Sequence, residues 1–497
     1  MNTATTPPHA ASSAPPSFTR LSNGEDLAAI VRPQEGLVSR RIFADPEVHA
    51  LELERIFARA WFFLGHESEI PQPGDAVTRV CGVDPVILVR DDDGVVRAFL
   101  NSCRHRGMRV CRTDRDNVRF FRCPYHGWTY RNNGQMQAAS CENHYGPGEL
   151  EKSELGLIPV AQIASYRGLY FATWDKAAPP LEEWLGDMRW YMDIIFGRTG
   201  ELEFVGVPQV WDAECSWKFV SDNFTDNFHV FWSHQSLVQL GLLPDFPDFA
   251  AHGHMVTAGN GHILHFVQGA PGEEATMGLG LPKSMWPRFA QNLNPAQAEI
   301  AMKHGYSAGT MWPNFHWLQL TTAADIETPP VGILNLRLEY PLSPTRTRSY
   351  SWFAVDKAAP PEYRKISYQN YVRNFGPGGI FDQDDMEVSA HRGSKCRGSR
   401  GTARAPEPNR FRRGPRQMSL EFLPHHGRAR SLLPLSDHPD RGADRASGAR
   451  RRSPARSSGA PAASPRTSPI AMARTRAAAS RPSRSRSLRQ RSSHGAA

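Results

Sequence analysis

The spacing of apolar residues predicts one helix near the start of the chain. Asp45-Pro46 is a typical helix start, because Asp caps the free backbone N–H groups and Pro fits the first turn. Apolar residues then follow at helical spacing as far as Ala60, so one face should be buried. We place this helix within 41–60, after a leader at 1–40 that we expect to be largely disordered.

After this helix the pattern changes to short runs of β-branched and other apolar residues. Residues 86–89 and 95–100 flank Asp93-Gly94, a dipeptide typical of tight hairpins. A further strand is predicted at about 168–174. Together these signals predict a small all-β domain, which we place at 61–178.

The segment 179–390 mixes helical and strand patterns. It lacks the regular alternation of strands and helices of a Rossmann fold, so the predicted class is α+β. It also lacks a glycine-rich dinucleotide fingerprint after a strand, which argues against direct binding of NADH. The helices that the spacing predicts cover 181–195, 217–232, 295–303 and 361–374.

The composition changes abruptly after residue 390. Residues 391–497 contain 24 Arg and one Lys against five acidic residues, with no Trp and no Tyr. Such a segment cannot bury enough apolar surface to offset its conformational entropy, so we expect a disordered low-complexity tail. We interpret it as a frameshift product, because Arg, Ala, Pro and Ser are typical of a GC-rich gene read out of frame. The alternative is a genuine Arg-Ser tail that binds RNA.

Charge and cysteine content narrow the functional class. Residues 1–390 carry 33 basic and 45 acidic side chains, which argues against a nucleic-acid-binding protein. The leader has no apolar core of a signal peptide, and no stretch is apolar enough for a membrane span, so we expect a cytoplasmic location. The seven cysteines are odd in number, and a disulfide framework is not expected in a reducing compartment. Cysteines paired with histidines are therefore better interpreted as metal ligands.

The first group of candidate ligands is Cys103-x-His105 followed by Cys123-x-x-His126. Each pair places one thiolate and one imidazole in a loop. Two such loops that face each other can hold a [2Fe–2S] cluster, with the cysteines on one iron and the histidines on the other. The alternative is a structural zinc site, which also takes two Cys and two His. We favour the cluster, because a Cys-x-His arm is uncommon in zinc fingers.

The second group lies in a segment that is predicted to be helical. Asp226 and His229 are three residues apart and would share a helix face. His229 and His234 are five apart, about 140° around a regular helix, so they can share a metal only if the helix ends or distorts between them. Two histidines and a carboxylate leave open positions on iron for oxygen and substrate. The alternative is a helix with ordinary histidines.

These motifs resemble those of the Rieske non-haem iron aromatic-ring-hydroxylating dioxygenases, over roughly residues 35–390. Cys-Arg-His-Arg-Gly and Cys-Pro-Tyr-His-Gly-Trp resemble the Rieske motif, which implies that its two Cys and two His bind the cluster. Asp226-x-x-His229-x-x-x-x-His234 is similar to the iron motif, except that Phe228 stands where a Tyr is usual. The segment from Phe375-Gly376-Pro377 to Asp384-Asp385 resembles the one that supplies the third iron ligand, which implies Asp385. Without the resemblance we would interpret this acidic segment as a solvated turn.

The resemblance implies the fold, the cofactors and the partners. The fold would be an all-β Rieske domain followed by a helix-grip catalytic domain, an antiparallel sheet with helices, whose C-terminal part is not recognisable here. The cofactors would be a [2Fe–2S] cluster and mononuclear Fe(II), with electrons that come indirectly from NADH through a reductase and usually a ferredoxin. Alpha subunits would form a trimer, with or without a small beta subunit. Asp226 would link His126 of one subunit to His229 of the next.

The reaction implied is addition of both atoms of O₂ to an aromatic ring, giving a cis-dihydrodiol. Phe224, Phe375 and Phe381 are expected to line the substrate pocket. The main alternative is a Rieske monooxygenase or an O- or N-demethylase with the same two metal centres. A Rieske electron carrier is a further alternative, but it would lack the second group of ligands.

Overall fold

A computed structural model of the chain describes residues 20–32, 35, 37–226, 228–243, 253–269, 276–323, 325–397 and 410–412. The first 19 residues of the expected leader lie outside this part. The rest of the leader contains α1 (Leu27–Ile30), β1 (Val31–Arg32) and β2 (Leu37–Ser39). The helix predicted at Asp45-Pro46 is α2 (Pro46–Glu52), and Asp45 accepts a hydrogen bond from the backbone N–H of Glu47 at 2.9 Å. The predicted capping interaction is therefore confirmed.

Three small antiparallel sheets follow α2, with strand orders β6-β5-β4-β7, β10-β9-β8 and β11-β12-β3. The predicted hairpin joins β5 (Asp84–Arg90) to β6 (Val96–Leu100). Buried Asp91 stabilises its turn by accepting hydrogen bonds from the N–H groups of Asp93 and Val95 at 3.0 and 2.9 Å. The predicted all-β architecture is confirmed. The other strands are β3 (Phe62–His66), β4 (Asp75–Cys81), β7 (Arg115–Asn117), β8 (Phe120–Arg122), β9 (Thr129–Arg131), β10 (Met136–Ala138), β11 (Gln162–Tyr166) and β12 (Leu169–Thr173).

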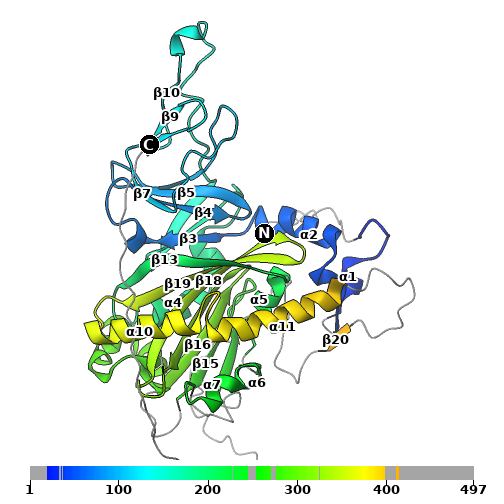
Figure 1. Cartoon of the computed structure of the whole chain (residues 1–497), viewed down its shortest axis with the longest axis vertical. Helices are drawn as coiled ribbons and strands as arrows, with labels where there is room; N and C mark the ends of the chain where they lie inside the picture. Colours follow the sequence, from blue (N-terminus) through cyan, green and yellow to red (C-terminus); the bar gives the residue numbers. More distant parts are fainter. Residues whose placement is uncertain are drawn as a thin grey trace, which may run out of the picture. The chain divides into compact units, whose positions relative to one another are not determined.

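A seven-stranded antiparallel sheet forms the next region, in the order β13-β19-β18-β17-β16-β15-β14. Its strands are β13 (Leu202–Ala213), β14 (Gly253–Thr257), β15 (Ile263–Gln268), β16 (His304–Met311), β17 (Phe315–Thr322), β18 (Val331–Ser343) and β19 (Arg346–Asp356). Helix α10 (Pro361–Asn374) packs on β18 and β19, and Figure 1 shows α10 and α11 (Ile380–Arg397) lying across the strands. Trp317 and Trp352 are fully buried in the core beneath. The predicted combination of an antiparallel sheet with helices is confirmed.

The helices of this region agree with the prediction at two places and differ at two. Helices α9 (Pro295–Lys303) and α10 have the predicted bounds. The helix predicted over 181–195 is divided into α3 (Leu181–Leu185) and α4 (Met188–Phe196) at Gly186, whose φ is 50°. The other short helices are α6 (Val230–Ser233), α7 (Gln235–Gln239) and α8 (Pro287–Asn292). The single helix predicted over 217–232 is wrong: α5 (Trp217–Asn223) ends early, and α6 begins seven residues later.

Helix α5 is anchored at its start against the N-terminal helix. The Trp217 ring is 1% exposed, and its indole N–H donates a hydrogen bond to Glu52 in α2 at 3.1 Å. Lys218 forms an ion pair with the same carboxylate. The Trp217 ring also packs edge-on against Phe57, with 5.2 Å between ring centroids. These contacts hold the start of α5, the helix that leads to the candidate iron ligands.

Helix α11 extends past the change in composition at residue 390 and ends at Arg397. Beyond it, the structure describes only β20 (Arg410–Arg412), which pairs antiparallel with β2. The rest of the expected tail lies outside the described residues. In the part of the chain that the structure describes, no helix combines the length and apolar character needed to cross a bilayer.

Candidate functional site: two metal centres

The two candidate Rieske loops share one backbone geometry. In each loop the cysteine N–H donates to the carbonyl five residues further on, at 2.8 Å for Cys103 and 2.7 Å for Cys123. The N–H of a glycine four residues after each cysteine donates back to the cysteine carbonyl at 2.9 Å. These glycines, Gly107 and Gly127, have φ of 73° and 71°, a conformation that glycine adopts without strain. Each loop therefore curls around its cysteine in the same way.

Each loop has a buried cysteine and a histidine with one ring nitrogen that lacks a hydrogen-bond partner. Cys103 and Cys123 are 3% and 2% exposed. The rings of His105 and His126 lie 4.6 Å apart, and the Nδ1 atom of each is buried without a hydrogen-bond partner. Buried polar atoms are rarely left unpaired, so two such nitrogens beside two buried thiols fit a bound metal group.

The donors of the two loops are two thiols and two imidazoles. This set can hold a [2Fe–2S] cluster, with the cysteines on one iron and the histidines on the other, or a tetrahedral zinc ion.

Two aromatic side chains to which the sequence analysis gave no role, Tyr130 and Trp128, support the loops. The buried hydroxyl of Tyr130 lies 3.2 Å from the Cys103 sulfur and accepts a hydrogen bond from the N–H of Arg104 at 3.0 Å. The ring of Trp128 stacks on His105 with 4.9 Å between centroids. Burial, together with nearby His126 and an arginine, lowers the pKa of His105. A neutral imidazole is the form that binds a metal.

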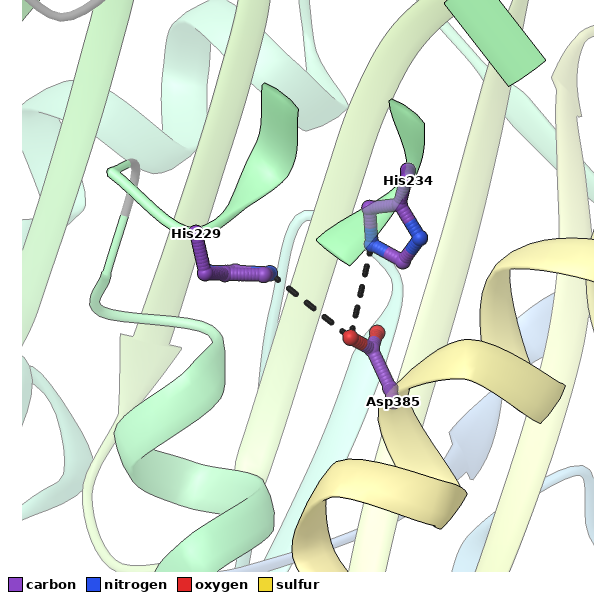
Figure 2. A group of neighbouring side chains, drawn as sticks. All are labelled: His229, His234 and Asp385. Carbon is purple, nitrogen blue, oxygen red and sulfur yellow. Dashed lines mark ion pairs between the residues drawn. The ribbon is translucent and has the colours of Figure 1, made fainter. Parts of the chain in front are cut away.

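The two histidines of the second centre flank the short helix α6. His229 precedes the first residue of α6, His234 follows its last residue, and Asp385 comes from α11 (Figure 2). One Asp385 oxygen lies 3.7 Å from Nε2 of His229 and 3.4 Å from Nε2 of His234. Because α6 ends at Ser233 and His234 has a non-helical φ of −106° and ψ of 29°, the angle that a regular helix would impose on a five-residue spacing does not apply. The structure thus brings together the three candidate iron ligands.

Two further carboxylates contact these histidines. Asp384 Oδ2 lies 3.2 Å from Nδ1 of His234, on the side of the ring away from Asp385. This contact orients the imidazole, and the sequence analysis had not assigned Asp384 a role. Asp226 Oδ2 lies 3.7 Å from Nδ1 of His229. The expectation that Asp226 and His229 share a helix face is wrong, because a turn after α5 brings them together instead.

Electrostatics keep the Asp385 carboxyl ionised. Burial disfavours its charge, but hydrogen bonding to His234 and the charges of both histidines hold its pKa below the usual range. The pKa of His234 is raised, because Asp385 and Asp384 outweigh the effect of burial. A set of one carboxylate and two imidazoles is the donor set that suits non-haem Fe(II).

A cavity opens onto the three ligands. Phe224, Phe375 and Phe381 all line it, as predicted, and Phe381 lies 4.5 Å from the His234 ring. The other apolar walls come from Val230, Ala308, Leu318 and Leu320. The polar lining residues outside the ligand set are Asn223, Tyr306, Arg337 and Asp382. A largely apolar cavity with a few polar groups beside a metal centre suits an aromatic substrate.

Comparison with known families gives two matches. The Rieske [2Fe–2S] domain family matches residues 60–162, and the catalytic domain of ring-hydroxylating alpha subunits matches residues 181–402. The second match extends beyond residue 390, in agreement with the extent of α11.

Individual relatives cover most of the same region. The alpha subunit of biphenyl dioxygenase from Paraburkholderia xenovorans is 35% identical over 73% of this chain and 80% of its own length. The alpha subunit of an N,N-dimethyl phenylurea N-demethylase from Sphingobium is 34% identical over 71% of this chain and 79% of its own length. The crystal structure of naphthalene 1,2-dioxygenase from Rhodococcus, bound to indole, is 40% identical, with a TM-score of 0.70 over 73% of this chain and 85% of that one.

Proposed function

This chain belongs to the Rieske ring-hydroxylating dioxygenases, as an alpha subunit, and from that premise we propose which of its residues carry each part of the reaction. The enzyme is the terminal oxygenase that adds both atoms of O₂ to an aromatic ring, with electrons from NADH delivered by a reductase and ferredoxin. Its cofactors are a Rieske [2Fe–2S] cluster and a mononuclear iron. The ligands that we assign to the cluster are Cys103, His105, Cys123 and His126, and those that we assign to the iron are His229, His234 and Asp385.

The single observation that carries the iron assignment is the convergence of three donors from two distant segments within 4.8 Å. When bound, iron at this site supplies the oxygen chemistry and the cluster supplies electrons. The chain's own part is to hold three donors on one side, so that the cavity side stays open. Asp384 holds the His234 ring in place, with 3.2 Å between Oδ2 of Asp384 and Nδ1 of His234. The phenylalanine side chains that line the cavity exclude water from it.

Asp226 is the residue that we propose for electron transfer between the centres. It lies beside His229, and its other oxygen accepts the N–H of Phe228 at 2.8 Å. Its side chain is 21% exposed, so the carboxylate can also contact a second molecule. Nearby Trp232 is 84% exposed, and Tyr125 in the second Rieske loop is 58% exposed. Exposed aromatic side chains favour association between molecules. We propose that the Rieske loops of one subunit dock beside Asp226 of the next, in a trimer of alpha subunits.

The variant Asp226→Ala tests this relay. We expect unchanged iron content and an unchanged Rieske electron paramagnetic resonance signal, but loss of electron transfer from the reduced cluster in single-turnover mixing. Asp325→Ala, at an exposed acid in a loop, is the control and should transfer electrons normally. Normal turnover of Asp226→Ala would refute the relay.

Labelled oxygen separates dioxygenation from the demethylase chemistry of one relative. With ¹⁸O₂, the dioxygenase reaction places two labelled oxygens in the product of one turnover, as a cis-dihydrodiol. Mass spectrometry of the products of a reconstituted reductase, ferredoxin and oxygenase system measures this directly. A product with one labelled oxygen would contradict dioxygenation.

The domain bounds are also part of the proposal. We place the Rieske domain at 61–178 and the catalytic domain from 179 to the end of α11, rather than to residue 390. The ion pair of Arg392 with Asp222 at 2.9 Å supports this extension, because it ties the last turns of α11 to α5.

A further inference from the structure

One guanidinium group borders the cavity beside the candidate iron ligands. Arg337 projects from β18, is 4% exposed, and lines the same cavity as His229, His234 and Asp385. Among the described residues that line this cavity, it is the only Lys or Arg. A buried cation in an otherwise apolar wall is costly unless it is paired, so its hydrogen-bonding pattern is informative.

The donors of Arg337 are only partly used by the protein. One terminal nitrogen forms an ion pair with Asp382, which also accepts the N–H of Gly376. The other terminal nitrogen lies 3.7 Å from Glu339, beyond hydrogen-bond distance. The Nε atom is buried and has no hydrogen-bond partner. The guanidinium lies 4.6 Å from the centre of the Trp211 ring. Thus the terminal nitrogen near Glu339, Nη1, and the Nε atom both lack a hydrogen-bond acceptor in the protein, and of the two only Nε is fully buried.

An unpaired guanidinium nitrogen does not by itself indicate a ligand-binding site. Arg198 is 1% exposed and also has two unpartnered nitrogens, yet it forms an ion pair with Asp356 at 3.0 Å and does not border this cavity. What distinguishes Arg337 is its place in the wall that a substrate of this centre would contact. A ligand can therefore reach it, and the same comparison supplies a control residue.

The surroundings of Arg337 indicate that the ligand is neutral. Glu339 is a second carboxyl beside the guanidinium, and it is fully buried. Burial raises the pKa of Glu339 to about 8 despite the nearby positive charge, so at neutral pH it keeps its proton. Asp382 already balances the single charge of Arg337. A substrate carboxylate would meet the same penalty as Glu339, whereas a neutral oxygen would accept the free N–H without adding charge.

We propose that Arg337 makes this cavity selective for an aromatic ring that carries a neutral oxygen acceptor, such as a carbonyl or an ether. The inference rests on the proposed function and names its substrate class. The acceptor binds Nη1 of Arg337, the terminal nitrogen that Asp382 leaves free, and the ring packs against Phe224 and Phe375 in the path to the iron ligands. A hydrocarbon of the same shape leaves the donor unpaired and is disfavoured about 10- to 100-fold.

Three probes of similar size test the proposal: acetophenone, ethylbenzene and benzoate. Equilibrium binding to the iron-replete enzyme gives a Kd for each, so the readout does not depend on turnover. We expect acetophenone to bind about 10- to 100-fold more tightly than either of the others. Equal binding of acetophenone and ethylbenzene, tightest binding of benzoate, or no binding of acetophenone would each overturn the proposal.

Two arginine variants test whether Arg337 causes the preference for acetophenone. Arg337→Lys keeps the positive charge beside Asp382 but has no second terminal nitrogen, so the preference for acetophenone over ethylbenzene should fall at least fivefold while iron content is unchanged. Arg198→Lys is the matched control at a buried arginine away from the cavity, and its preference should equal that of the wild type. A preference that survives Arg337→Lys would show that another group recognises the oxygen. A failure of the proposed function would give a different result. The ratio of the Kd values of ethylbenzene and acetophenone would persist, but the fully reduced enzyme would oxygenate none of the probes.

Discussion

Arg392→Met provides a quantitative test of how the last turns of α11 hold the catalytic domain together. Arg392 lies 2.9 Å from Asp222 and 4.3 Å from the Phe219 ring, and the side chains of the ion pair are 31% and 10% exposed. Burial already raises the pKa of Asp222, and Arg392 counteracts this effect. Without Arg392 the carboxyl should take up a proton rather than remain charged in the interior.

The loss of stability in Arg392→Met follows from the free energy of protonating Asp222. The ordinary pKa of the Asp222 carboxyl is 3.8, and each pH unit above that value adds about 1.4 kcal/mol to the free energy of protonating it. At pH 7 protonation therefore costs at most about 4 kcal/mol. At pH 5 the same reasoning gives about 1.5 kcal/mol. Because the folded-state pKa of this acid is raised, stability is retained below pH 3.8 and is lost as the pH rises towards the folded-state value. The variant should therefore differ from the wild type more at pH 7 than at pH 5.

Urea denaturation followed by tryptophan fluorescence at pH 5, 6, 7 and 8 measures this difference. Asp222→Asn supplies the control background, since it removes the charge that Arg392 neutralises. Adding Arg392→Met to Asp222→Asn should cost at least about 2 kcal/mol less than Arg392→Met alone at pH 7. If the loss of unfolding free energy caused by Arg392→Met does not change with pH, or is the same in the wild-type and Asp222→Asn backgrounds, then Arg392 does not act by neutralising Asp222.

Three further substitutions test other parts of the account. Asp385→Asn should remove the mononuclear iron, so that iron analysis falls from about three to about two per chain while the Rieske signal persists. Tyr130→Phe removes the hydroxyl at 3.2 Å from the Cys103 sulfur and should lower the cluster's reduction potential in a redox titration; an unchanged potential would contradict a hydrogen bond to the bound sulfur. Phe381→Ala, at a 5% exposed wall residue, should cost about 3–5 kcal/mol in urea denaturation; a change below about 1 kcal/mol would show that this wall is loosely packed.

The sequence was most informative where local chemistry decides the structure. The cap at Asp45, the hairpin between β5 and β6, and the bounds of α9 and α10 follow from turn and capping residues, and they were predicted from the sequence. The resemblance of the motifs to a known family also led to residues that the fold brings together, because His229, His234 and Asp385 do converge.

The structural features that were not predicted from the sequence depend on tertiary contacts. Nothing like Pro marks the end of α5 at Asn223, so periodicity extended that helix to residue 232. The composition changes at 390, yet Arg392 and buried Cys396 keep α11 helical beyond it. The contacts of Asp384 and of Arg337 join segments far apart in the sequence, and an isolated charged residue carries no local signal of such a partner.

This chain has one site for an iron–sulfur cluster and a separate site for a single iron. Both sites can be tested at once by anomalous diffraction at the iron absorption edge, from crystals of anaerobically prepared protein. We expect a two-iron peak between the Cys103 and Cys123 loops and a one-iron peak among His229, His234 and Asp385. A zinc signal between the loops, or no iron at either position, would contradict this expectation.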